Sequence, residues 1–165
     1  QLVDTMVILK DGKVVKCGPV ENVFSDIQLR DAIGDQHTGV ILDTTVLEHD
    51  TEFGITRLDF MGQTLSVPLQ SIPKGQGLRV HIHSKDVSLA TQPPEGLTSV
   101  LNILKTQVKT IGESAGYSVD IELDAGRPLL ATITRKSLSN LNLQVGQPIY
   151  AFIKAIKMIH DGERN

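Results

Sequence analysis

Several residue types on which common protein classes depend are scarce in this sequence. It contains a single cysteine, Cys17, so an internal disulfide and a thiolate zinc site are both excluded. It has no tryptophan, four phenylalanines, two tyrosines and a net charge of −3, whereas proteins that bind single-stranded nucleic acid need stacking rings over a cationic groove. No segment approaches the roughly 18 to 20 consecutive apolar residues of a membrane-spanning helix. We therefore expect a soluble protein from a reducing compartment that does not bind nucleic acid.

The beginning of the chain also lacks features of a complete protein. Its 165 residues start with Gln1 rather than methionine, and no charged-then-apolar leader opens the sequence. The length is enough for one domain or for two very small ones. We expect a piece of a longer protein, with no export signal in this fragment.

Two common motifs of enzyme active sites are absent as well. The sequence has neither a Gly-x-x-x-x-Gly-Lys-Ser/Thr loop nor a His-Glu-x-x-His pair. Asp120, Glu122 and Asp124 alternate along one predicted strand, which indicates an acidic, solvent-facing side rather than acid–base catalysis. His81 and His83 share a face of another predicted strand, but no third metal ligand lies nearby in the sequence. The fragment is therefore not expected to be an enzyme or to hold a metal ion.

What the sequence does contain is mostly strand-forming. An Asp11-Gly12 pair between two β-branched runs predicts a hairpin, and Pro19 suits the first turn of a helix over 20–25. A second short helix is predicted over 27–33. From Gly39 onward, runs of Val, Ile, Leu and Thr are separated by turn residues every eight to twelve positions, as in all-β folds. The predicted strands span 39–49, 54–60, 63–69, 78–84, 102–111, 118–123, 128–133 and 148–156.

The strands fall into two similar halves on either side of a polar stretch, 91–96, whose paired prolines cannot lie inside a strand ladder. The segment that begins at Gly54 matches the segment that begins at Gly116. Further on, Gly75-Gln76 matches Gly146-Gln147, which places His83 opposite Lys154. We interpret this as a duplicated small barrel of OB type with one degenerate copy.

One group of residues in the second half could carry chemistry. Thr134 and Ser137 are three positions apart where a strand is predicted to end and a helical turn to begin, so that hydroxyls and free amides favour an anion. Lys154 follows an apolar run in a predicted strand, where a buried ammonium needs a counter-ion. A tetrahedral oxyanion such as molybdate or tungstate only accepts hydrogen bonds, and these donors suit it. The alternative is a simple helix cap and a lysine that reaches solvent.

These segments resemble a known family. Ile133–Ser137, Leu141–Gly146 and Ile153–Ala155 are similar to the Mop, or TOBE, module that binds molybdate and tungstate. The similarity continues through 79–89 and 99–104, as in the tandem module at the C-terminus of the ATP-binding subunit of molybdate ABC importers. Residues 4–18 resemble the closing hairpin of an ABC ATPase domain.

The resemblance implies an all-β fold of tandem OB-like barrels. Residues 1–34 would be the C-terminal remnant of the ATPase domain, residues 35–92 a first, degenerate lobe, and residues 97–160 the second lobe. This division leaves room for strands exchanged between the lobes. ATP and magnesium would belong to the absent ATPase domain, and the fragment itself would hold no cofactor.

The resemblance also implies a set of oxyanion ligands. They fall on Thr134, Ser137 and Lys154, with the amide of Ala155 beside them. The family's Ser-Ala-Arg-Asn segment reads Ser99-Val-Leu-Asn102 here, so Ser99 and Asn102 join the set and the arginine is absent.

The function implied is that of a regulatory domain in the cytoplasm, at the inner membrane. Homodimers formed through the barrels would hold molybdate at their contact and inhibit transport by the permease subunits of the parent complex. The alternative is a structural TOBE module for dimerisation or protein docking, without a ligand.

Overall fold

The computed structural model describes residues 5–10, 13–19 and 38–159. The predicted hairpin is confirmed: β1 (Thr5–Lys10) pairs antiparallel with β2 (Lys13–Pro19). Pro19 is the last residue of β2, opposite Thr5, and not part of a helical turn. Proline is tolerated there because a strand end makes little use of its missing N–H. The helices predicted over 20–25 and 27–33 lie outside the described residues.

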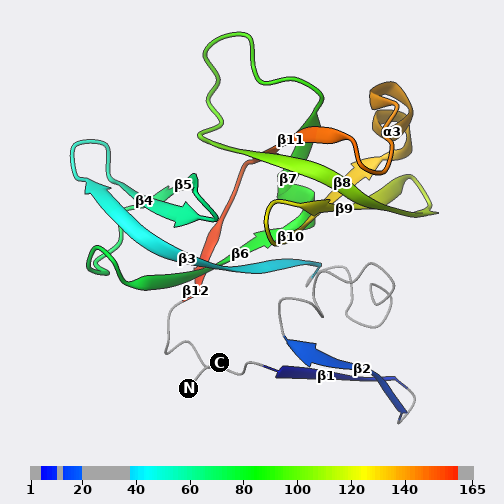
Figure 1. The fold of residues 1–165 in the computed structure, drawn as a ribbon, viewed down its shortest axis with the longest axis horizontal. Helices are drawn as coiled ribbons and strands as arrows, with labels where there is room; N and C mark the ends of the chain where they lie inside the picture. The colour runs from blue at the N-terminus through cyan, green and yellow to red at the C-terminus, as the bar shows by residue number, and fades with distance from the viewer. Residues whose placement is uncertain (1–4, 11–12, 20–37, 160–165) are drawn as a thin grey trace.

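Two five-stranded antiparallel sheets form the rest of the described fold, which confirms the all-β prediction (Figure 1). The first half of the chain supplies β3 (Gly39–Asp50), β4 (Ile55–Phe60), β5 (Gln63–Pro68) and β6 (Gly77–His83). The second half supplies β8 (Asn102–Ala115), β9 (Ser118–Asp124), β10 (Pro128–Thr134), the helix α3 (Arg135–Leu141) and β11 (Pro148–Ile153). We call the two sheets with their connections the first and second lobe.

Alternation of apolar and polar residues sets which side of each strand enters the core. In β3, Val40, Leu42, Thr44 and Val46 are buried, while Ile41, Asp43 and Thr45 between them are more exposed. In β11, Ile149, Ala151 and Ile153 are buried in the same way. This period of two made the longer strands predictable from the sequence.

Each lobe contains one short strand from the other half of the chain. After β6, a single turn η3 (Ser84–Asp86) leads into β7 (Val87–Ala90), which pairs with β11 of the second lobe. At the other end, β12 (Lys157–Ile159) pairs with β6 of the first lobe. The strand predicted over 148–156 is therefore wrong beyond Ile153, because the chain leaves one sheet there to reach the other. Residues 91–101 contain no helix or strand.

The internal repeat appears in matching hydrogen bonds. In the first lobe the Val46 amide donates to Gln76 O at 2.9 Å, and the Gly75 amide donates to Val46 O at 2.8 Å. In the second lobe the Val108 amide donates to Gln147 O at 2.9 Å, and the Gly146 amide donates to Val108 O at 2.7 Å. The two glycines have φ angles of 85° and 86°, a left-handed conformation that side chains disfavour. The repeated Gly-Gln pairs thus mark the same turn in both lobes.

Side-chain amides join the two lobes along β5 and β8. β9 pairs with β8 only from Gln107 onward, so the first residues of β8 have an open edge. Gln63 covers Lys105 there: its Oε1 accepts from the Lys105 amide at 2.7 Å and its Nε2 donates to Lys105 O at 3.1 Å. Conversely, the side-chain amide of Asn102 in β8 accepts from the backbone amide of Ser66 in β5 and donates to the Ser66 carbonyl oxygen. These reciprocal pairs satisfy backbone groups at two strand edges.

Candidate functional site

The hydroxyl pair predicted at the end of β10 is a helix cap. Thr134 is the N-cap of α3, and its Oγ1 accepts a hydrogen bond from the Ser137 amide at 3.0 Å. The two hydroxyl oxygens are 2.9 Å apart. Thr134 is exposed and Ser137 is half-buried. The predicted cap is therefore confirmed, and both hydroxyls lie where a partner molecule could reach them.

The environment predicted for Lys154 is wrong. The residue follows the end of β11 and is exposed, so burial imposes no cost on its ammonium. Buried positions in β11 are the odd-numbered ones, and Lys154 is in phase with the outward-facing Tyr150 and Phe152. Its backbone amide donates to Asp86 O at 2.9 Å, which fixes the start of its side chain. No described residue makes a hydrogen bond or an ion pair with the ammonium itself.

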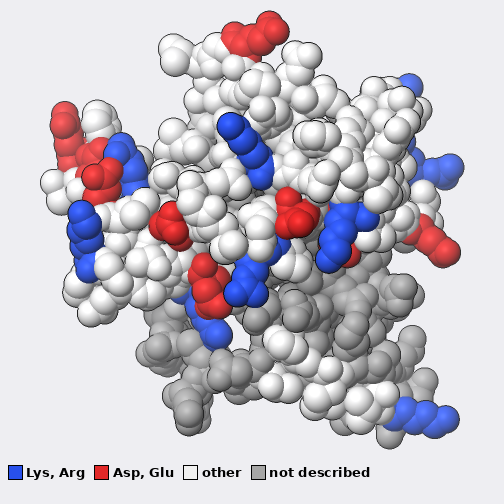
Figure 2. All heavy atoms as spheres, in the orientation of Figure 1, with Lys and Arg blue, Asp and Glu red and all other residues white. Residues whose placement is uncertain are grey.

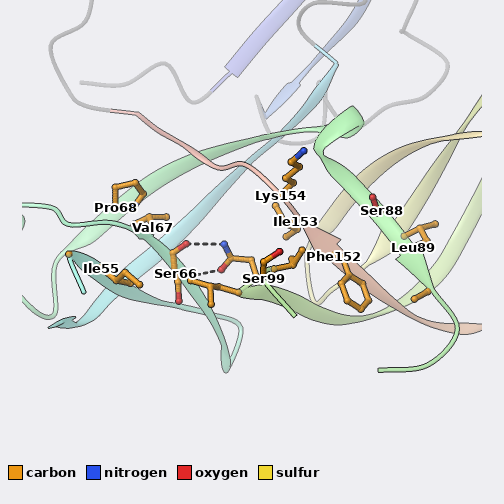
Figure 3. Close-up of a pocket in the computed structure, with 15 residues that line it drawn as sticks. Ile55, Ser66, Val67, Pro68, Ser88, Leu89, Ser99, Phe152, Ile153 and Lys154 are labelled. Atoms are coloured by element: carbon orange, nitrogen blue, oxygen red, sulfur yellow. Dashed lines mark hydrogen bonds between the residues drawn. The ribbon is translucent and has the colours of Figure 1, made fainter. Parts of the chain in front are cut away.

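Lys154 lies on the wall of a cavity of about 690 Å³ between the lobes (Figure 3). Apolar groups dominate the cavity wall, and Figure 3 shows Lys154 extending from the end of β11, away from the ring of Phe152. Hydroxyl groups come from three different segments. The residues that line the cavity are Gly54, Ile55, Ser66, Val67, Pro68, Ser88, Leu89, Ala90, Ser99, Val100, Leu101, Asn102, Phe152, Ile153 and Lys154.

The cavity brings together Ser99, Asn102 and Lys154 from the predicted ligand set. Thr134 and Ser137 do not line it, and neither does the exposed Ala155. The predicted ligands of one chain therefore fall into two groups, a lysine group at the cavity and a hydroxyl group at the α3 cap.

Asn102 already has partners for its amide. Its Oδ1 accepts from the Ser66 amide at 2.6 Å, its Nδ2 donates to Ser66 O at 2.9 Å, and the residue is 8% exposed. Both polar ends of the side chain are thus engaged in joining the lobes. Ser66 and Ser88 also line the cavity, and no sequence signal marks them, because β7 is too short to be predicted and β5 carries no ligand motif.

The prediction that Asp120, Glu122 and Asp124 share a solvent-facing side is wrong for Asp120. That residue is 2% exposed and accepts a hydrogen bond from Thr132 Oγ1 at 2.6 Å. Glu122 pairs with Lys109 at 3.0 Å, and Asp124 is exposed. The η3 turn, which comes from the first half of the chain, packs against β10 next to Thr132, the hydrogen-bond partner of Asp120. It therefore covers this part of the sheet. The alternation of residues along the strand could not show that another segment covers Asp120.

Two other patterns have structural roles. Gly112–Gly116 matches the Gly-x-Ser-x-Gly pattern of hydrolases, but it lies where β8 turns into β9, whereas a nucleophile turn joins a strand to a helix. His81 and His83 have ring centroids 6.4 Å apart, and His83 Nδ1 accepts the Lys85 amide at 3.1 Å as the cap of η3. Within the described ranges, no three side chains of His, Cys, Asp or Glu come close enough to hold a metal ion.

The first lobe has no counterpart of the α3 hydroxyl pair. Thr134 is opposite Ser118 at the end of β10, and the matching position at the end of β5 is Pro68, opposite Ile55. A short loop replaces the helix in the first lobe. Of the two repeats, only the second carries the cap.

Charged side chains are interspersed on the face shown in Figure 2, where basic and acidic groups lie next to one another. Arg57 pairs with Glu48, and Arg79 pairs with Asp43 at 2.9 Å. A face of this kind lacks the continuous positive field that attracts a nucleic acid backbone. In the part of the chain that the structure describes, we find no helix of the length and apolarity required to cross a membrane.

Comparisons with known proteins agree with this architecture. Residues 98–159 match the TOBE domain family. The chain is 35% identical to the molybdenum import ATP-binding protein ModC of Paramagnetospirillum magneticum over 94% of its length, which is 43% of that protein. It is 37% identical to ModC of Mesorhizobium japonicum over 94% of its length, which is 42% of that protein. The chain therefore spans less than half the length of these relatives.

A solved structure is similar as well. The crystal structure of the cytoplasmic molybdate-binding protein ModG, with molybdate bound, matches with a TM-score of 0.57 and 25% sequence identity. The match covers 72% of this chain and 92% of that one. The strand arrangement, the TOBE match over residues 98–159 and the similarity to ModC and ModG agree with one another.

Proposed function

We propose that this chain is the oxyanion-binding regulatory domain of the ATP-binding subunit of a molybdate or tungstate ABC importer. The observation that carries the proposal is the position of Lys154. Its ammonium has no partner among the described residues and stands at a cavity that also presents the hydroxyl of Ser99. The similarity to ModC and ModG suggests which anion fills the role.

The donor chemistry fits a tetrahedral dianion. Molybdate and tungstate are fully ionised at neutral pH and can only accept hydrogen bonds, so a suitable site offers hydroxyls, amides and a cation. Ser99 supplies a hydroxyl and Lys154 supplies the cation, and no acidic side chain lines the cavity. Thr134, Ser137 and the amide of Ala155 would complete the coordination.

A second copy of the chain would bring the two ligand groups together. In one chain, Thr134 and Ser137 stand apart from the Lys154 cavity. A twofold dimer would place the α3 cap of each chain at the cavity of its partner and would create two equivalent sites. We therefore propose a homodimer formed through the barrels, with the oxyanion at the contact.

The regulation follows from linkage. If the dimer binds molybdate better in one arrangement of the ATPase subunits, the ligand shifts the equilibrium toward that arrangement. We propose that imported molybdate accumulates in the cytoplasm, binds between the barrels and stabilises a transport-incompetent state.

In the parent complex, residues 1–34 would end the ATPase domain that binds ATP and magnesium. Residues 35–92 and 97–160 would form the two lobes, and the complex would contact the membrane permease subunits.

A structural module without a ligand is the second candidate. Asn102, one of the implied ligands, is engaged with Ser66, and Leu101 stands where the family has an arginine. Leu97 and Leu101 are strongly exposed apolar side chains, and Leu101 is part of the cavity wall. Exposed apolar groups of this kind favour a protein contact.

Calorimetric titration with molybdate, tungstate and sulfate separates the two candidates. We expect heat with molybdate or tungstate on the folded dimer, and a loss of at least tenfold in affinity for Lys154→Gln. The matched control is Lys74→Gln, which removes the same charge from an exposed loop of the first lobe. Absence of heat with all three anions, for protein shown to be folded and dimeric, would leave the structural module as the function.

A further inference from the structure

A chain of hydrogen-bonded side chains, Ser84, Thr132 and Asp120, links the first half of the sequence to the second. Ser84 Oγ lies 2.7 Å from Thr132 Oγ1, and Thr132 Oγ1 lies 2.6 Å from Asp120 Oδ1. Ser84 is fully buried and Asp120 is 2% exposed. Thr132 Oγ1 donates to Asp120 Oδ1, and since a hydroxyl carries a single hydrogen, the bond between Ser84 and Thr132 uses the hydrogen of Ser84. The direction of both hydrogen bonds is thereby fixed.

The η3 turn, which begins at Ser84, contacts β10 just before the Thr134 cap and also contacts the backbone of Lys154. Through Ser84 it is bonded to Thr132, two residues before the Thr134 cap. Through the carbonyl of Asp86 it accepts the Lys154 amide at 2.9 Å. The next residue, Val87, pairs with Ile153. A single turn from the first half of the chain thus touches the strand before the hydroxyl group and the backbone of the lysine.

We propose that Ser84, Thr132 and Asp120 form a latch that positions the two ligand groups relative to each other. They are positioning residues, since none lines the cavity or offers its polar atom to a ligand. The carboxylate of Asp120 holds the Thr132 hydroxyl in one orientation, and this leaves the Thr132 oxygen as the acceptor for Ser84. The η3 turn is then fixed against β10 and carries the backbone of Lys154 with it. The ligand-positioning part of the inference rests on the proposed function.

Hydrogen exchange of the Lys154 amide tests the latch without any ligand. Thr132→Val removes the shared hydroxyl and keeps the shape of the side chain. We expect the Lys154 amide to exchange about tenfold faster, because of the two bonds that Thr132 makes, the one to Ser84 holds η3 and its loss is worth roughly one hydrogen bond. The Val46 amide, bonded to Gln76 O in the first lobe, is the internal reference for global opening.

The matched control is Thr106→Val. Thr106 is likewise a threonine of the second sheet, it is buried, and its Oγ1 donates to Ile149 O at 2.9 Å, away from η3. We expect this variant to leave the exchange ratio of Lys154 to Val46 unchanged. An unchanged ratio in Thr132→Val as well, with the protein folded, overturns the latch. If Thr132→Val does not fold, Ser84→Ala applies the same test and leaves the bond between Thr132 and Asp120 in place.

Molybdate affinity tests the positioning role. We expect Thr132→Val to weaken binding about tenfold and Thr132→Ser, which restores the hydroxyl, to recover it. Faster exchange at Lys154 with unchanged affinity would overturn the positioning role. If the unsubstituted chain does not bind molybdate, the proposed function fails, and the exchange experiment still decides whether the latch holds η3.

Discussion

Replacing Asn102 by alanine tests whether this residue joins the lobes or binds the oxyanion. Its amide makes two hydrogen bonds to the backbone of Ser66, on the outer edge of β5, which is an edge strand of the first sheet. A typical intramolecular hydrogen bond contributes about 1 kcal/mol net. We therefore expect Asn102→Ala to lower the free energy of unfolding by about 2 kcal/mol. For a chain of this length that corresponds to a fall in Tm of about 4–8 °C.

Urea denaturation monitored by circular dichroism measures the change, with equal m-values required for the comparison. Asn102→Asp should be at least as harmful, because it keeps the acceptor but turns a carboxylate oxygen toward the Ser66 carbonyl. Gln144→Ala, which shortens an exposed amide side chain, is the control. A loss below about 0.5 kcal/mol for Asn102→Ala, combined with weaker molybdate binding, would refute the joining role and restore Asn102 as a ligand.

Further predictions concern the repeat, the cap and the exchanged strand. Gly75→Ala and Gly146→Ala should each cost about 1–2 kcal/mol in urea denaturation, because both positions have φ near +85°; a cost at only one would contradict the matched turns. Thr134→Ala should cost about 1 kcal/mol and speed exchange of the Ser137 amide, whereas Thr134→Ser should preserve both; equal behaviour of the two variants would argue against the cap. Met158→Pro removes an N–H from β12 and should speed exchange of β6 amides, since β12 covers that edge; unchanged protection in β6 would mean that β12 does not pair there in solution.

The part of the candidate site that could be read from the sequence is local. The cap at Thr134 follows from a hydroxyl at a strand end and a second hydroxyl three residues later, a spacing set by the geometry of one helical turn. The longer strands follow from alternation, as in β3, and the duplicated turns follow from Gly-Gln pairs. Each of these signals spans a few neighbouring residues.

The parts that could not be predicted depend on residues far apart in the chain. β7 has four residues and β12 has three, too few for a period of two to be recognised. The burial of Asp120 depends on Ser84 and its neighbours, which are separated from it by more than thirty positions. A carboxylate in an alternating strand has the same sequence pattern whether water or another segment covers its face.

The sequence by itself determined the all-β fold, the repeat, the α3 cap and the resemblance to the oxyanion-binding family, because strand periodicity, turn glycines and caps are encoded in adjacent residues. The tertiary structure alone decided which short strands cross between the lobes, β7 and β12, and that Lys154 is exposed at a cavity. It also decided that Asn102 joins the lobes and that the predicted ligands form two separate groups. These outcomes depend on which distant edges and faces cover one another, and a linear pattern of residues does not contain that information.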